Sequence, residues 1–208
     1  MDPSRKTMLS VEDLCFSWPQ QPLFEQLSFQ VPAGVSVVVG DDGVGKSTLL
    51  ALLAGAIQPQ SGRLVIDGIK CDEHPGTYRH KVFWIDPQTD IHNAITANEF
   101  LKSQSEHFPH FDTRRFAPLV QGFSLEPHLA KPLYMLSTGS RRKVWWVAAF
   151  AANTPVVLLD QPFAALDGPS SRFLCDLLDE ASGHTDRAWL LADHSVPKGV
   201  NPKVVIGL

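Results

Sequence analysis

Gly40-Asp41-Asp42-Gly43-Val44-Gly45-Lys46-Ser47-Thr48 follows the apolar run Val35–Val39 and precedes the apolar segment Leu49–Ala54. This order predicts a strand, a glycine-rich loop and the start of a helix. The loop follows the pattern G-x-x-x-x-G-K-[ST], which is typical of a phosphate-binding loop (P-loop). Gly43 and Gly45 let successive backbone N–H groups point inward at phosphate oxygens, and the helix N-terminus adds its unpaired N–H groups. Lys46 can neutralise phosphate charge and Ser47 can ligate Mg²⁺. The loop therefore predicts a site for a nucleoside triphosphate and Mg²⁺, lined by residues 40–48.

Length and composition narrow the class of protein. A chain of 208 residues with 44% hydrophobic residues fits one α/β domain. The net charge of −4 and the pI near 6.0 do not indicate a basic surface for nucleic acid, so we expect no nucleic-acid partner. We expect the arginine pairs Arg114-Arg115 and Arg141-Arg142 to lie on solvated helix faces. No apolar run approaches the roughly 18 residues of a membrane span, and the N-terminus lacks the hydrophobic core of a signal peptide. Together these features predict a cytoplasmic chain.

Apolar runs and turn residues predict two kinds of strand and a helical stretch. Val35–Val39, Val156–Leu159 and Ala188–Ala192 are apolar throughout, as in strands buried on both faces of a parallel sheet. Three runs joined by turn residues favour antiparallel pairing: Met8–Phe16, Leu27–Val31 and Arg63–Ile66. Two further runs, Val82–Ile85 and Val204–Ile206, are also expected to be strands. The expected helices are Thr96–Phe108, Asp112–Ala117, Thr138–Ala152 and Pro169–Ala181.

Two downstream segments suggest which kind of P-loop protein this is. Val156–Asp160 reads as a buried strand ending in an acid, and in a P-loop domain that acid lies beside the Mg²⁺ site. Asp160 could instead cap a turn. Leu136-Ser137-Thr138-Gly139-Ser140 opens a predicted helix and could form a second anion-binding helix end, or it could be a simple N-cap.

With these residues in place, the chain resembles the nucleotide-binding domain of ABC transporters over essentially its whole length. Leu136–Ser140 is similar to the family's LSGGQ signature, and Gln88 looks like its Q-loop glutamine. Asp167, in Ala165-Leu166-Asp167, resembles the D-loop aspartate, His194 the switch histidine, and Trp18 the aromatic that stacks on adenine. Each has a plainer alternative: Trp18 as a core anchor, Gln88 as a turn residue, His194 as a strand-end histidine.

The resemblance implies a fold and a mode of action. It implies a P-loop NTPase core with an antiparallel β subdomain and a helical subdomain at about residues 89–152, all in one domain 1–208. It implies a head-to-tail dimer, homo- or heteromeric, in which Ser137, Thr138 and Gly139 of one subunit cover ATP on the P-loop of the other. Gln88 would report the γ-phosphate and Mg²⁺ to a membrane permease on a separate chain, and Asp167 would join the two sites. The protein would then sit at the cytoplasmic face of the membrane.

The short chain and unadorned C-terminus are similar to those of small exporter ATPases, such as the haem-exporter subunit of cytochrome c maturation. This likeness favours export over import. A soluble ABC protein of translation or DNA repair is a third hypothesis, but those usually carry tandem domains or long coiled coils, and this chain shows neither. The permease would determine the transported substrate.

Two positions depart from the family pattern. The signature reads Ser-Thr-Gly-Ser in place of Ser-Gly-Gly-Gln, and Gln161 stands at the catalytic glutamate position. Glutamine can hydrogen-bond to water but cannot take its proton, and general-base assistance is worth about 10²–10⁴-fold. We therefore expect ATP binding with slow hydrolysis. Gln161 is either native, in which case the chain could be a silent regulatory subunit, or an engineered change from glutamate.

Overall fold

Two β-sheets and two groups of helices make up the computed structural model, which describes residues 6–19 and 21–208. The antiparallel sheet has the order β2-β1-β4-β5 and the second, parallel sheet the order β6-β7-β8-β3-β9. The strands are β1 (Thr7–Trp18), β2 (Gln21–Pro32), β3 (Gly34–Val39), β4 (Ser61–Ile66), β5 (Ile69–Lys70), β6 (Val82–Phe83), β7 (Val156–Asp160), β8 (Ala188–Asp193) and β9 (Val204–Gly207). The helices are α1 (Lys46–Leu53), α2 (Pro75–Arg79), α3 (Ala97–His107), α4 (Phe116–Gly122), α5 (Thr138–Ala151) and α6 (Gly168–Ser182), and short 3₁₀ turns occur at Thr113–Arg115, Glu126–His128 and Leu133–Met135.

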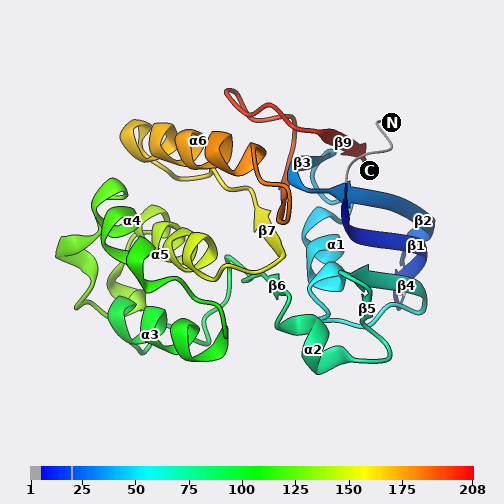
Figure 1. The fold of residues 1–208 in the computed structure, drawn as a ribbon, viewed down its shortest axis with the longest axis horizontal. Helices are drawn as coiled ribbons and strands as arrows, with labels where there is room; N and C mark the ends of the chain where they lie inside the picture. Colours follow the sequence, from blue (N-terminus) through cyan, green and yellow to red (C-terminus); the bar gives the residue numbers. More distant parts are fainter. Residues whose placement is uncertain (1–5, 20) are drawn as a thin grey trace.

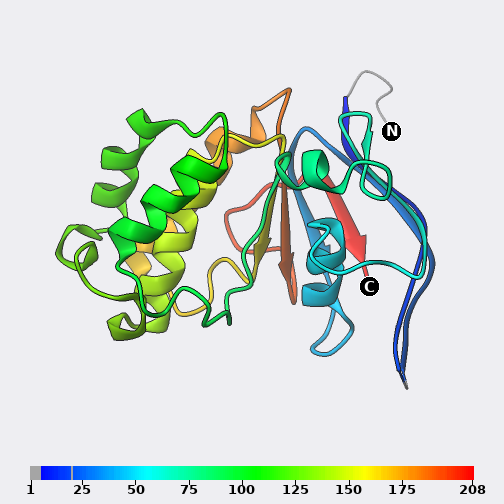
Figure 2. The same ribbon diagram turned by 90° about the horizontal axis from the view of Figure 1, so that it is seen from below.

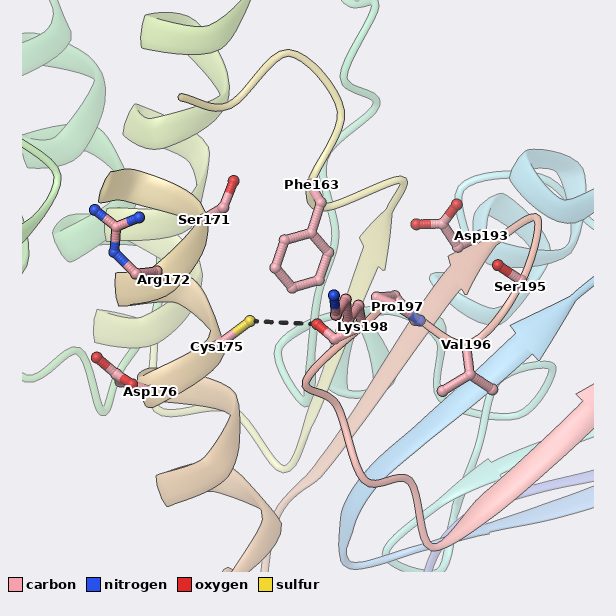
Figure 3. Close-up of a pocket in the computed structure, with 10 residues that line it drawn as sticks. All are labelled: Phe163, Ser171, Arg172, Cys175, Asp176, Asp193, Ser195, Val196, Pro197 and Lys198. Carbon is pink, nitrogen blue, oxygen red and sulfur yellow. Dashed lines mark hydrogen bonds between the residues drawn. The ribbon is translucent and has the colours of Figure 1, made fainter. Parts of the chain in front are cut away.

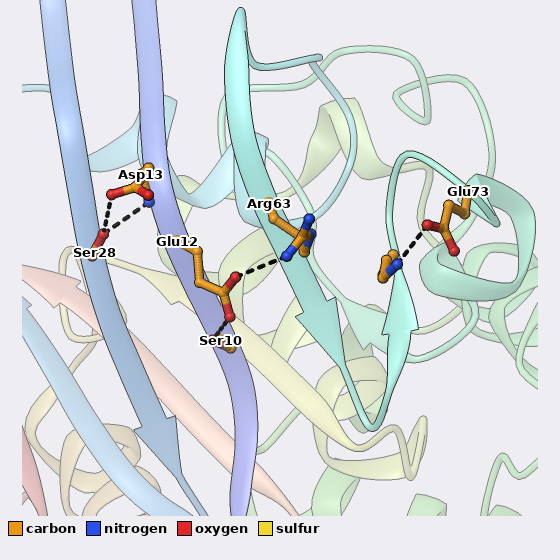
Figure 4. Close-up of polar contacts among 7 residues, drawn as sticks. Ser10, Glu12, Asp13, Ser28, Arg63 and Glu73 are labelled. Carbon is orange, nitrogen blue, oxygen red and sulfur yellow. Dashed lines mark hydrogen bonds and ion pairs between the residues drawn. The ribbon is translucent and has the colours of Figure 1, made fainter.

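The antiparallel sheet confirms the pairing expected from the turn residues. β1 pairs with both β2 and β4. One face contributes Leu9, Val11 and Leu64 to the core, while other side chains of the sheet make solvent-exposed polar contacts. Arg63 Nη1 donates to Glu12 across the strands at 3.3 Å (Figure 4). The sheet is therefore amphipathic, as expected for an antiparallel sheet with one solvated side.

The parallel sheet lies between two apolar layers, which explains its uniformly apolar strands. Alternate residues of β7 point to opposite faces: Val157 and Leu159 pack with α3–α6, and Val156 and Leu158 pack with α1 and the antiparallel sheet. Figure 2 shows this order from left to right: helices, parallel sheet, α1 and then the long β1–β2 ribbon. The expectation that three of the apolar runs form a parallel sheet is confirmed.

The chain between β6 and β7 forms α3, α4 and α5, which lie together at the left of Figure 1. α5 carries buried side chains along most of its length and shares one hydrophobic cluster with the parallel sheet. Phe150 of α5 stacks on Trp189 of β8 with ring centroids 4.3 Å apart. The helical stretch is thus tied to the sheet by aromatic packing, and the predicted boundaries at residues 89–152 stay a prediction.

Some sequence expectations need correction. The helix expected at Asp112–Ala117 is a 3₁₀ turn, Thr113–Arg115, followed by α4. Pro118 falls in the first turn of α4, where its missing N–H removes no intrahelical bond. β6 is only two residues long, and α2 and β5 were not expected at all because such short elements carry too little periodicity. Among the described residues, no helix is long and apolar enough to cross a bilayer.

Candidate functional site

Three neighbouring parallel strands bring the predicted site segments to one edge of the sheet. β3 ends at Val39 before the P-loop, β7 ends at Asp160, and β8 ends at Asp193 before His194. β8 pairs with both β3 and β7 in parallel. Because parallel strands share their direction, their carboxyl ends meet, and this is where open α/β sheets bind ligands. Residues separated by more than a hundred positions therefore meet in one site.

The P-loop has the backbone that its glycines predict. Gly43 has a φ of 79° and Gly45 a φ of 102°, in the region that favours glycine. A Cβ atom on Gly45 would lie 2.8 Å from Cδ2 of Leu23, so the β2 side chain leaves no room there. Lys46 Nζ donates to the carbonyl oxygens of Gly40 at 2.6 Å and Asp41 at 2.7 Å. The ammonium group is thus held inside the loop by two backbone carbonyl oxygens.

Ser47 and Asp160 form a donor pair suited to a hard cation. Ser47 Oγ donates to Asp160 Oδ2 at 2.5 Å. Asp160 Oδ1 is buried and has no hydrogen-bond partner among the described residues. Burial raises the pKa of the Asp160 carboxyl above its ordinary value, and the nearby charge of Asp86 raises it further. A hydroxyl beside a carboxylate with a free buried oxygen fits Mg²⁺, which is bound through few protein oxygens together with phosphate.

Asp86 is a site residue that the sequence analysis missed. Its Oδ1 accepts the backbone N–H of the exposed Gln88 at 2.9 Å, and its charge reaches Asp160. The available signal was an acid after the strand-like run that precedes Gln88, the same signal that identified Asp160. Asp86 therefore links the Gln88 segment to the Ser47–Asp160 pair.

Gln161 follows β7 in an uncommon backbone conformation. Its φ is 43°, a left-handed value that is unfavourable for a residue with a Cβ atom. Its N–H donates to Ala192 O at 2.8 Å, and its carbonyl oxygen accepts Arg142 Nη1 at 2.6 Å. The expectation that Arg141 and Arg142 are solvated is wrong. Arg142 is partly buried against this strand end, and Arg141 Nη1 donates to Asn93 at 3.0 Å.

His194 and Trp18 are both exposed, and His194 lies beside the P-loop. His194 Nε2 is 3.4 Å from Asp42 Oδ1 of the P-loop, with both side chains largely exposed. Trp18, the last residue of β1, is 48% exposed and packs edge-on against Phe16 with ring centroids 5.1 Å apart. Exposure of nearly half the ring does not fit a core anchor, so the alternative of an adenine-stacking ring stays open for Trp18.

The signature segment forms a helix N-terminus. Ser137 is the N-cap of α5, and its Oγ accepts the N–H of Ser140 at 3.1 Å. Ser137 and Thr138 are exposed, whereas Gly139 is buried. A Cβ on Gly139 would collide with the backbone carbonyl of Ala165. Glycine is therefore required here for close packing of α5 on the Ala165 loop.

Asp167 has two local partners. As the N-cap of α6 it accepts the N–H of Ser170 at 2.8 Å, and its other carboxylate oxygen accepts Lys143 Nζ of α5 at 2.6 Å. The Lys143 hydrogen bond, followed by those from Ser170, holds the pKa of Asp167 far below its usual value. This ion pair connects the start of α6 to the helix that begins with the signature.

A cavity of about 800 Å³ lies beside the site, between α6 and the segment after β8 (Figure 3). The Phe163 ring points into it, and Cys175 Sγ lies 3.7 Å from the Lys198 carbonyl oxygen at its rim. Its lining comes from the Phe163 loop, α6 and residues 193–198, and so it adjoins the P-loop site without including the P-loop.

A glycine-rich phosphate loop, a serine–aspartate pair and a parallel sheet with helices on both faces define a P-loop nucleoside triphosphatase. Residues 24–164 match the family model described as ABC transporter, and the chain belongs to this family.

Curated relatives and a solved structure agree with this assignment. The chain is 31% identical over 161 residues to the cytochrome c biogenesis ATP-binding export protein CcmA of Legionella pneumophila (strain Lens), covering 77% of this chain and 80% of the relative. It is 29% identical over 201 residues to the taurine import ATP-binding protein TauB of Escherichia coli O157:H7, covering 93% and 76%. A solved ATP-binding subunit of an ABC transporter superposes with a TM-score of 0.82 at 28% identity, covering 90% of this chain and 80% of that one. The chain is an ABC transporter ATP-binding subunit.

Proposed function

We propose that this subunit drives an exporter through ATP-dependent closure of a head-to-tail dimer. The observation that carries the proposal is the placement of α1 and α5 on opposite faces of the parallel sheet. The exposed Ser137 and Thr138 at the start of α5 therefore do not cover the P-loop that precedes α1 in the same chain. A second ATP-binding subunit, identical or related, brings its own signature to that P-loop.

Each site residue has a task in binding. The P-loop backbone from Gly40 to Gly45 surrounds the phosphates, and Lys46 turns from the loop carbonyls to the β- and γ-phosphate oxygens. Ser47 and Asp160 would hold Mg²⁺, which supplies charge neutralisation to the phosphates when it is bound. Trp18 offers its exposed face to the adenine ring.

Hydrolysis depends on Gln161 and on the groups around it. Gln161 orients the attacking water but cannot accept its proton, so turnover is slow and the closed dimer persists. His194, held near Asp42, stabilises charge at the γ-phosphate, and Gln88 reports phosphate and metal to the permease. A catalytically silent regulatory subunit is the second candidate, and it is favoured by Gln161 itself.

The surface around the Gln88 segment suits a membrane permease on a separate chain. Ile91, Tyr134 and Met135 are large apolar side chains that are all more than half exposed. The Tyr134 N–H donates to Asn93 O at 3.1 Å, so the two segments that carry these side chains lie side by side. Docking there would hold the subunit peripherally at the cytoplasmic face of the membrane.

Steady-state ATPase measurements test the proposal. The chain as given is compared with Gln161→Glu and with a matched control, Gln121→Glu, at an exposed position of α4. We expect tight ATP binding in all three and a rise in turnover of about 10²-fold or more for Gln161→Glu alone. If Gln161→Glu binds ATP but stays silent when assembled with its permease, the regulatory function replaces the motor.

A further inference from the structure

Arg142 joins the signature helix to the strand end that carries Gln161. It lies in the second turn of α5, five residues after the N-cap Ser137. Its Nη1 donates to the carbonyl oxygen of Gln161 at 2.6 Å and to that of Asp160 at 3.2 Å. The side chain is partly buried, which lowers the pKa of the guanidinium group, and the negative charges of Asp160 and Asp193 act against that lowering. Hydrogen bonds from a charged donor are among the strongest a backbone carbonyl can receive.

The backbone of Gln161 is held on both sides. Its N–H is bonded to Ala192 of β8, and its carbonyl accepts both Arg142 and the N–H of Ala164. A left-handed φ at a non-glycine residue persists only where surrounding contacts impose it. Among the described residues, Arg142 supplies the charged contact to this peptide. These contacts fix the backbone of Gln161 and with it the direction of its Cα–Cβ bond.

α5 is packed along most of its length, so we expect it to move as one rigid helix. The exposed residues at its start, Ser137 and Thr138, belong to the signature segment. Every residue from Lys143 to Ala151 is buried. Arg142 stands between these two parts. A shift of the signature end of α5 therefore moves the guanidinium group that holds Gln161.

We propose that Arg142 is a positioning residue that aligns Gln161 for hydrolysis and couples this alignment to the signature end of α5. The inference rests on the proposed function. In the closed dimer the signature of this chain lies on the nucleotide of the partner subunit. Arg142 then makes the hydrolytic position of one site respond to nucleotide capture at the other.

The test uses the full chain carrying Gln161→Glu, which provides measurable turnover. Into it are placed Arg142→Gln, Arg142→Lys and a control, Arg114→Gln, whose exposed guanidinium pairs only locally with Asp112. ATP affinity, KM and kcat are measured. We expect affinity to stay within about twofold while Arg142→Gln lowers kcat about tenfold or more. Lysine, with a single ammonium group in place of the guanidinium fork, restores part of the loss.

The comparison of kcat with KM separates positioning from a general structural role. Misplacement of residue 161 lowers kcat while KM and ATP affinity stay near those of the parent. Partial recovery of kcat by Arg142→Lys shows that a charged donor is needed at position 142. A kcat for Arg142→Gln equal to that of Arg114→Gln would overturn the proposal.

Amide hydrogen exchange tests the contact without hydrolysis. In the ATP-free chain with Gln161 unchanged, Arg142→Gln should speed amide exchange at Gln161 and Ala164 about tenfold relative to Arg114→Gln. Equal exchange rates in Arg142→Gln and Arg114→Gln would overturn the proposal. If Arg142→Gln lowers the overall stability, the exchange rates of Arg142→Lys are compared with those of Arg114→Gln instead. Loss of ATP binding in the Gln161→Glu parent would instead count against the proposed function, leaving the exchange result to decide on Arg142.

Discussion

Replacing Gly45 with alanine tests the geometry of the P-loop at its tightest point. The added Cβ would lie 2.8–3.0 Å from three side-chain carbons of Leu23, and it would have to adopt a φ of 102°. The backbone conformation costs about 1–2 kcal/mol for a residue with a Cβ atom. Displacing Leu23 costs about 1–3 kcal/mol more. Loss of glycine freedom in the unfolded chain offsets about 0.4–1 kcal/mol.

The net cost of Gly45→Ala is therefore about 1–5 kcal/mol. It falls on overall stability if the loop keeps its shape, or on ATP affinity if the loop distorts, as a loss of about 5- to 2,000-fold. Gly43→Ala is the matched control, because its φ of 79° is also positive but its Cβ would meet nothing within 4 Å. At Gly43 only the cost of the left-handed backbone applies. The loss of stability or affinity for Gly43→Ala should therefore be smaller than that for Gly45→Ala by the cost of displacing Leu23.

The cost of the collision with Leu23 is measured by urea unfolding and ATP titration. The variants compared are Gly45→Ala, Leu23→Ala and the double variant. Truncating Leu23 removes the collision but leaves the positive φ, so the double variant should recover about 1 kcal/mol or more relative to additivity. A coupling energy within 0.5 kcal/mol of zero, together with equal penalties at Gly43 and Gly45, would refute the reasoning from steric contact.

Two further predictions concern buried and paired carboxylates. Burial raises the pKa of Asp160, so in the absence of ligand its contribution to stability falls as pH rises from the ordinary carboxyl pKa through the raised one. Asp160→Asn should therefore raise the ligand-free melting temperature at pH 7 while abolishing stabilisation by Mg²⁺-ATP, and a variant that keeps the Mg²⁺ effect would contradict the assigned role. The pKa of Asp167 is depressed, so its contribution is complete above about pH 4 and is lost as pH falls towards the folded pKa. Asp167→Asn keeps the N-cap of α6 but loses the ion pair with Lys143, in which the Asp167 side chain is more than half exposed. The substitution should therefore lower the free energy of unfolding by up to about 1 kcal/mol at pH 7, and by progressively less below pH 4. A cost that does not change with pH in urea titrations would show that the ion pair does not stabilise the protein.

Local chemistry made much of the fold predictable. Val35–Val39 and Val156–Leu159 are apolar throughout, and a strand with that pattern has to be covered on both faces, as β3 and β7 are. The P-loop was predictable in detail because Gly43, Gly45, Lys46 and Ser47 each meet a separate requirement of phosphate binding. The helix beginning near Thr96 was predictable from its own sequence, and its capping box with Glu99 is present.

Other parts of the site arise only from tertiary contacts. Nothing in the sequence around Arg142 indicates that its guanidinium group reaches the carbonyls of Asp160 and Gln161, since that contact depends on how α5 packs against β7. The influence of Asp86 on Asp160 and the approach of His194 to Asp42 depend in the same way on strand order. Gly139 was expected to face phosphate, and the structure shows that it also makes room for the Ala165 carbonyl.

The sequence by itself determined the longer strands, the glycine-rich loop and the order of the motifs, and it shows glutamine at position 161. These are local properties, set by side-chain periodicity and by residues a few positions apart. The tertiary structure alone decided which charged groups lie beside one another at the carboxyl edge of the sheet. Those contacts join residues far apart in the chain, and their energies depend on burial and distance, which a linear pattern does not encode.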